Sequence, residues 1–138
     1  MRCGDKMKTI LVCSDRDGTI TKDENYYLGS SPRWKEQVEF LPGVVDGIKF
    51  LNSIDGLEFF VITNQSGVAL QGKDFDELTE ERMHEVNRYV IQILAEQGAI
   101  VRGYFACPFV DLKYAKKAAE RGRSVNPKFV VDNHPDLK

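Results

Sequence analysis

The chain has 138 residues, of which 42% are hydrophobic and 29% are charged, and its formal net charge is −2. This length and mixture are typical of one globular domain and exclude a disordered or fibrous chain. The near balance of charges leaves no overall positive field for nucleic acid or an anionic membrane. No apolar run approaches the ~20 residues of a membrane helix, and residues 10–13 are too short for a signal peptide. We therefore expect a cytoplasmic protein, monomeric or weakly dimeric, with no nucleic-acid or membrane partner.

Several segments have the composition of regular secondary structure. The first, at residues 9–14, is β-branched and apolar without polar alternation, as in a strand covered on both faces. A long polar excursion over residues 21–39 follows it. Helices are then predicted from residue 44 to about 53, and from an N-cap at Thr79 to Gly98. The remaining predictions are strands at 57–63, 99–106 and 128–131, and a short helix at 111–121.

Strand and helix alternate along the chain, which is the pattern of a parallel sheet in an α/β fold. Doubly wound domains commonly have about five or six strands, whereas this length holds roughly three or four. We therefore expect an α/β, Rossmann-like, three-layer α/β/α arrangement with a mainly parallel sheet and no large cap. Residues 1–138 would form a single domain whose C-terminal part is missing.

Two carboxylates, Asp15 and Asp17, follow directly on the first predicted strand, within the sequence Asp-Arg-Asp-Gly-Thr. Ligands of open α/β sheets bind at the carboxyl ends of the strands, and residues two apart in an extended chain point to the same side. Paired carboxylates suit a hard cation such as Mg²⁺, and one of them can also act as a nucleophile or an acid. A solvated turn is the plain alternative, because Asp and Gly favour turns.

A second polar motif, Thr-Asn-Gln-Ser-Gly, begins at Thr63 and Asn64, at the end of the second predicted strand. A hydroxyl, an amide and backbone N–H groups beside a glycine are suited to hold a phosphate group. The alternative is an ordinary hydrophilic loop. The two motifs together are more specific than either alone.

Together they resemble the motifs of the haloacid dehalogenase superfamily of phosphatases. The sequences at residues 15–20 and 63–68 are similar to the branch that contains histidinol-phosphatase and heptose-1,7-bisphosphate phosphatase. Phe-Leu-Pro-Gly-Val at residues 40–44 and Tyr-Phe-Ala-Cys-Pro at residues 104–108 agree with that branch. The resemblance covers residues 9–108 and is weak beyond them.

The resemblance implies that Asp15 is the nucleophile that takes the phosphoryl group as an aspartyl-phosphate. Asp17 would protonate the leaving alcohol and later activate water as a base. The Asp15 carboxylate and the Asp17 main-chain carbonyl would bind Mg²⁺, and Thr63 and Asn64 would bind the phosphate oxygens. This arrangement is physically sensible, because a carboxylate attacks an anionic phosphate only when a cation and several donors neutralise the charge between them.

The activity implied is Mg²⁺-dependent hydrolysis of a small phosphorylated metabolite. A sugar phosphate or bisphosphate is the first choice of substrate, and histidinol phosphate is the second. A catalytically silent phosphate-binding domain of the same fold is the rival. It is supported by one departure from the family, since no acidic fourth motif follows to complete the metal site.

Three further features limit or extend the resemblance. The family's phosphate-binding lysine is assigned to Lys138, with Lys128 as the alternative. Cys107 matches the opening of the branch's zinc loop. No later Cys pair exists and His134 stands alone, so no zinc is expected. Cys107 should instead be a buried or half-buried thiol. Lys and Arg residues between 113 and 123 form a basic cluster, which is either a solvated helix face or a patch that attracts phosphorylated substrate.

Overall fold

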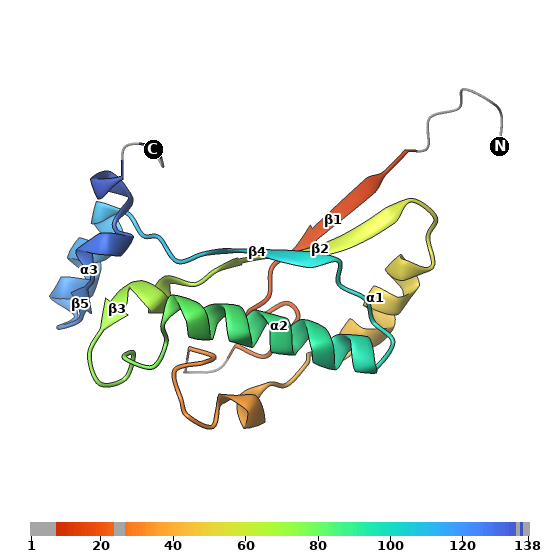
Figure 1. Ribbon diagram of the computed structural model, residues 1–138, viewed down its shortest axis with the longest axis horizontal. Coiled ribbons are helices and arrows are strands. Elements are labelled where there is room, and N and C mark those ends of the chain that lie inside the picture. The colour runs from red at the N-terminus through yellow and green to blue at the C-terminus, as the bar shows by residue number, and fades with distance from the viewer. Residues whose placement is uncertain (1–7, 24–26, 135, 137–138) are drawn as a thin grey trace.

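The computed structural model describes residues 8–23, 27–134 and 136. Three parallel strands form the main sheet, and they lie in the order β1-β2-β4, with β2 in the middle (Figure 1). This confirms the α/β class with a parallel sheet. The strands are β1 (Ile10–Ser14), β2 (Leu57–Asn64) and β4 (Gly103–Cys107).

Helix α1 (Val44–Asn52) connects β1 to β2, and helix α2 (Glu80–Glu96) connects β2 to β4. Both helices pack on one face of the sheet, because Ile48 of α1 and Val86 of α2 join Val61 of β2 in a single buried cluster. The predicted N-cap of α2 is confirmed, since the Thr79 hydroxyl accepts a hydrogen bond from the Arg82 N–H at 3.1 Å.

The opposite face of the sheet is largely open to solvent in the part of the chain that the structure describes. Leu11 and Phe105 are each 62% exposed, and Ile62 is 49% exposed. The expectation that the first strand is covered on both faces is therefore wrong for these residues. Of the three layers expected, the described residues form the sheet and the helical layer made by α1 and α2.

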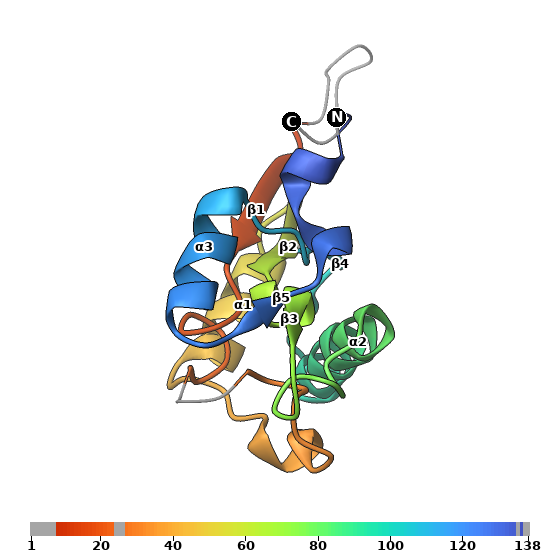
Figure 2. The ribbon, with the colours of Figure 1, turned by 90° about the vertical axis from the view of Figure 1, so that its left-hand side faces the viewer.

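A smaller unit packs beyond the carboxyl ends of β2 and β4, at the left of Figure 1. Its two-stranded antiparallel sheet pairs Leu70 with Val125, a pairing of two-residue strands that the sequence did not predict. Figure 2 shows this unit facing the viewer, with α3 on one side of the pair β3 and β5 and α2 on the other. Its elements are β3 (Leu70–Gln71), α3 (Leu112–Glu120) and β5 (Ser124–Val125).

The strand predicted over residues 128–131 is wrong. Two short 3₁₀ helices, Pro127–Phe129 and Val131–Asn133, occupy this segment, and only Val130 makes a single bridge, to Val110. The cause is local, because Pro127 fixes its own backbone and the Asn126 side chain accepts the Lys128 N–H at 3.0 Å, which together start a turn.

The described part of the polar excursion, residues 21–23 and 27–39, contributes to the core. Leu28 and Trp34 are buried within it, and the Trp34 ring meets Tyr89 of α2 edge-on, with ring centroids 5.1 Å apart. None of the described helices has the length and apolar composition needed to cross a membrane.

Candidate functional site

The carboxyl ends of β1 and β2 meet at one edge of the sheet. In their parallel pairing Ser14 lies opposite Val61, so Asp15 leaves β1 beside the segment that holds Thr63 and Asn64. The structure therefore brings the first and second motifs together, as the sequence predicts. Thr63 is buried at this edge, whereas the Asp15 and Asn64 side chains are exposed.

The first motif folds as a tight turn in which the Asp15 carboxylate stays open to solvent. Asp15 Oδ1 accepts the Arg16 N–H at 2.9 Å, and the Arg16 carbonyl accepts the N–H of Ile20 at 2.8 Å. Gly18 has a φ of +78°, a left-handed conformation that other residues rarely adopt, and it lets the chain reverse direction here. An exposed carboxylate at a strand end is placed to meet a ligand from solvent.

The Asp17 carboxylate, in contrast, already accepts four hydrogen bonds. Oδ1 accepts Arg16 Nε at 2.9 Å and the Thr21 hydroxyl at 3.2 Å, while Oδ2 accepts Arg16 Nη2 at 3.2 Å and Gln65 Nε2 at 3.3 Å. A carboxylate has about four lone-pair positions. The Asp17 side chain is therefore held in one orientation, and its weakest contact is the one from Gln65, whose two amide hydrogens also face the Thr63 hydroxyl at 2.6 Å and the Asn64 carbonyl at 3.1 Å.

A buried polar network connects the two motifs, and the sequence reasoning missed it. The Gln65 amide donates to the Thr63 hydroxyl at 2.6 Å and accepts Arg16 Nη2 at 3.1 Å. Arg16 Nη1 donates to Asn87 Oδ1 of α2 at 2.8 Å. One signal was present in the sequence, because Asn87 lies four residues after Met83 on the apolar stripe of α2, where a polar side chain needs a buried partner.

The oxygen atoms at this edge fit part of a Mg²⁺ site. Mg²⁺ is commonly held by one or two carboxylates and keeps several waters, and the exposed Asp15 carboxylate is suited to it. The Asp17 side chain is already engaged, so its main-chain carbonyl is the better ligand. Among the described residues no group of three or more His, Cys, Asp or Glu could hold a metal ion.

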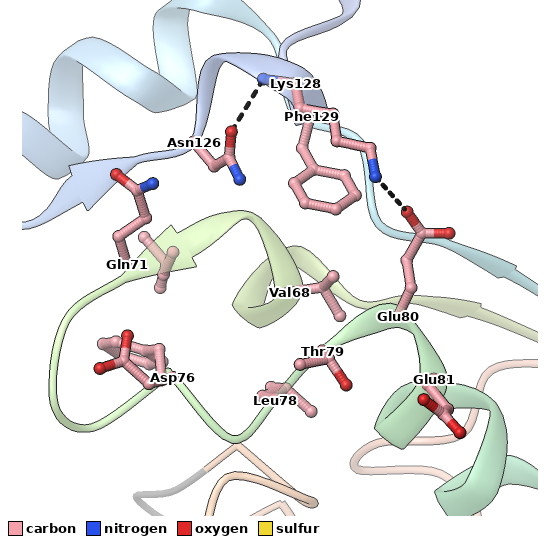
Figure 3. Close-up of a pocket in the computed structure, with 12 residues that line it drawn as sticks. Val68, Gln71, Asp76, Leu78, Thr79, Glu80, Glu81, Asn126, Lys128 and Phe129 are labelled. Atoms are coloured by element: carbon pink, nitrogen blue, oxygen red, sulfur yellow. Dashed lines mark hydrogen bonds and ion pairs between the residues drawn. The ribbon is translucent and has the colours of Figure 1, made fainter.

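Of the two candidates for the phosphate-binding lysine, the structure describes Lys128. Lys138, the first choice from the sequence, lies outside the described residues. Lys128 lies at a cavity of about 470 Å³ between the start of α2 and the 3₁₀ helix Pro127–Phe129, and its ammonium group is 3.8 Å from Glu80 (Figure 3). None of Asp15, Asp17, Thr63 and Asn64 lines that cavity.

Cys107, at the end of β4, is exposed, so the expectation of a buried or half-buried thiol is wrong. The reason is that Cys107 pairs with Asn64 on the open face of the sheet, where the described residues place no covering element. The His134 ring packs against Phe109 with centroids 5.6 Å apart. The absence of zinc stays a prediction.

A small cavity of about 140 Å³ lies beside the second motif and is lined by three residues of the basic cluster. It is lined by Ser66 of that motif and by Lys117, Arg121 and Arg123 from α3 and the loop after it. Tyr27 also lines it, and burial raises the pKa of the Tyr27 phenol above its usual range, with Tyr114 adding to the rise and Arg123 opposing it. Cations beside the second motif suit an anionic group on a ligand.

Curated proteins with similar sequences carry one name. The chain is 34% identical, over 94 residues, to a D-glycero-beta-D-manno-heptose-1,7-bisphosphate 7-phosphatase from Rhodopseudomonas palustris. The aligned residues make up 68% of this chain and 46% of that protein. A protein of the same name from Pseudomonas putida is 37% identical over 98 residues, or 71% of this chain and 50% of that protein. The chain is a relative of these phosphatases. It spans about half the length of the curated relatives it matches. No family model matches the sequence.

Solved structures agree with this relationship. A HAD-like phosphatase from Mesorhizobium loti is similar with a TM-score of 0.58 and 30% identity, over 80% of this chain and 47% of that chain. A D,D-heptose 1,7-bisphosphate phosphatase from B. bronchiseptica, complexed with magnesium and phosphate, has the same fold with a TM-score of 0.59 and 23% identity, over 84% of this chain and 64% of that chain. The resemblance to haloacid dehalogenase-like phosphatases and the fold class predicted from the sequence are therefore confirmed.

Proposed function

We propose that this chain is the core of a Mg²⁺-dependent phosphatase that hydrolyses a sugar bisphosphate through an aspartyl-phosphate. The observation that carries the proposal is the meeting of Asp15, Asp17 and Thr63 at one sheet edge, with the Asp15 carboxylate open to solvent. The relatives named as heptose bisphosphate phosphatases support the reaction and the class of substrate.

The chemistry assigned to these residues has two steps. In the first, an Asp15 oxygen attacks phosphorus, the bond to the sugar oxygen breaks, and Asp17 gives that oxygen a proton. In the second, water attacks the phosphorus of the aspartyl-phosphate, Asp17 takes the proton of the water, and the Asp15 carboxylate is released with inorganic phosphate. A bound Mg²⁺ supplies positive charge between the carboxylate and the phosphate oxygens.

Thr63 and Asn64 bind the phosphate oxygens in this proposal, together with a lysine, Lys138 or Lys128. The second phosphate of a bisphosphate is matched by the basic cavity beside Ser66, where Lys117, Arg121 and Arg123 meet. That cavity favours a bisphosphate over histidinol phosphate, which carries one phosphate and a cationic amine. We further propose that residues 1–138 act as one domain of a cytoplasmic protein that is monomeric or weakly dimeric.

Phosphate release tests the proposal. The full-length protein should release phosphate from a heptose 1,7-bisphosphate with Mg²⁺ and should lose this activity when the metal is chelated. Histidinol phosphate and a sugar monophosphate serve as comparison substrates and should be hydrolysed with a lower kcat/KM. Binding of inorganic phosphate without hydrolysis of any of the three esters would instead support the catalytically silent domain.

A further inference from the structure

Arg16 stands between the two carboxylates of the first motif, and its side chain is buried with only 1% exposure. Burying a guanidinium group is costly unless its donors are paired. Here Nε, Nη1 and Nη2 all have partners: the Asp17 carboxylate, Asn87 of α2 and the Gln65 amide. A buried cation with this many partners fixes the position of each of them.

The geometry of the pair restricts Asp17 more than a single contact would. Arg16 Nε and Nη2 reach the two carboxylate oxygens at 2.9 and 3.2 Å, in the two-pronged arrangement that only arginine offers. This pair joins two side chains that are adjacent in sequence, so its position depends on what else holds the guanidinium group. The Gln65 amide oxygen accepts Arg16 Nη2 at 3.1 Å and gives it one attachment, and a second attachment would tie it to a further element.

Asn87 provides that second attachment. Its Oδ1 accepts Arg16 Nη1 at 2.8 Å, and its own Nδ2 donates to the Met83 carbonyl at 3.0 Å, one turn earlier in α2. The side-chain amide is therefore fixed at both ends, by the helix backbone at Nδ2 and by Arg16 at Oδ1, and it is fully buried. Helix α2 thus holds Arg16, and Arg16 holds Asp17.

We propose that Arg16 is a positioning residue for Asp17, and that Asn87 transmits the position of α2 to it. This rests on the proposed function, in which Asp17 exchanges a proton with the leaving alcohol. A proton on Oδ2 takes the place of the weakest donor there, Gln65 Nε2 at 3.3 Å, whose two hydrogens are also within reach of the Thr63 hydroxyl at 2.6 Å and the Asn64 carbonyl at 3.1 Å. The Arg16 pair keeps the orientation of the carboxylate while that replacement occurs.

Two esters with different leaving groups distinguish the positioning of Asp17 from a merely structural role of Asn87. An alkyl phosphate needs a proton on its leaving oxygen, whereas p-nitrophenolate leaves without one. The ratio of kcat/KM for these two esters therefore reports the acid step, because kcat/KM covers events only up to loss of the alcohol. In the full-length protein, Asn87→Ala should lower kcat/KM about tenfold for the alkyl phosphate and about threefold or less for p-nitrophenyl phosphate.

Two further variants complete the test. Arg16→Lys keeps the charge but cannot reach both oxygens, so it should lower the ratio by at least as much as Asn87→Ala. Val90→Ala removes buried apolar volume from the same helix, and Val90 is as buried as Asn87, at 2%. It should lower the free energy of unfolding and leave the ratio as in the wild type.

The outcomes can be told apart. The positioning role is overturned if the activity depends on Asp15 but Asn87→Ala leaves the ratio of the two kcat/KM values unchanged. It is also overturned if Val90→Ala lowers this ratio as much as Asn87→Ala does. Either result leaves the proposed function standing. Hydrolysis of both esters by Asp15→Asn, or no hydrolysis by the wild type, overturns the proposed function and the positioning role together.

Discussion

Ser14 of β1 lies opposite Val61 of β2 in the parallel sheet, three residues before the end of β2 at Asn64. The two strands therefore do not end side by side, because β2 is longer at this end and its residues Thr63 and Asn64 lie beyond the last residue of β1. The turn that begins at Asp15 folds into the space beside this extension. The first and second motifs meet because of this difference in strand ends.

Asp15→Asn should abolish turnover while leaving the fold intact. Asn has nearly the shape of Asp, and its oxygen can still accept the Arg16 N–H, but it is neither a carboxylate nucleophile nor an anionic metal ligand. Phosphate release and the circular dichroism spectrum check the two parts. The control is Asp55→Asn, an exposed aspartate in the loop that precedes β2, which should behave as the wild type. Near-normal turnover by a folded Asp15→Asn protein would exclude the mechanism.

Asp17→Asn should be less damaging than Asp15→Asn. The main-chain carbonyl remains available to the metal, and acid–base help of this kind is typically worth about 10²–10⁴-fold in rate. The variant also replaces one acceptor oxygen by a donor, so part of the four-bond arrangement around the carboxylate is lost. Steady-state kinetics at saturating Mg²⁺ give the measurement. A rate within a few-fold of the wild type would remove Asp17 from the mechanism.

Protein purified without added metal should contain well under one zinc ion per chain. A structural zinc site needs four ligands, whereas Cys107 and His134 are the residues that the zinc-loop resemblance offers here. Elemental analysis after gel filtration provides the measurement, and Cys107→Ser serves as the control that should leave the metal content unchanged. Stoichiometric zinc that disappears in Cys107→Ser would show that the loop after β4 is a metal site.

A polypeptide limited to these residues should be poorly active and prone to association. Leu11, Ile62 and Phe105 form an exposed apolar face, and β1 is an edge strand among the described residues. A longer chain with a further Asp-containing strand should be active, since that strand would add the acidic metal ligand. Light scattering and phosphatase rates of the two lengths decide the matter, with Phe105→Ser as a variant that should reduce association. Full activity from a monodisperse 138-residue chain would contradict both expectations.

The parts of the fold that follow from periodicity were predictable. The stripe of α2 and its Thr79 cap, and the apolar runs of β1 and β2, are local patterns that tertiary contacts reinforce. The β3–β5 pairing was not predictable, because strands of two residues carry no period and are defined by partners about fifty residues away. The segment 128–131 is apolar because Phe129 and Val130 pack in a core cluster, and not because it is a strand.

The residues at the strand ends were predictable from the sequence, and the buried hydrogen-bond network around Arg16 was not. Asp15 follows β1, Thr63 and Asn64 end β2, and the carboxyl edge of a parallel sheet brings such residues together. The direction of the Arg16 side chain depends instead on Asn87, a residue of a different element whose contact no spacing rule predicts. A lone polar residue on the apolar stripe of a helix therefore predicts a buried charged partner elsewhere in the chain.

The partners Arg16 and Asn87 are separated by 71 positions in the chain. A ribosome that adds about 5–20 residues per second needs on the order of 4–14 s to make that interval. During this time the first motif has left the peptidyl-transferase centre, but the side chain that anchors its arginine has not yet been synthesised. Until then the guanidinium group lacks its Asn87 partner, and this edge of the sheet takes the form described here only when α2 docks on the sheet.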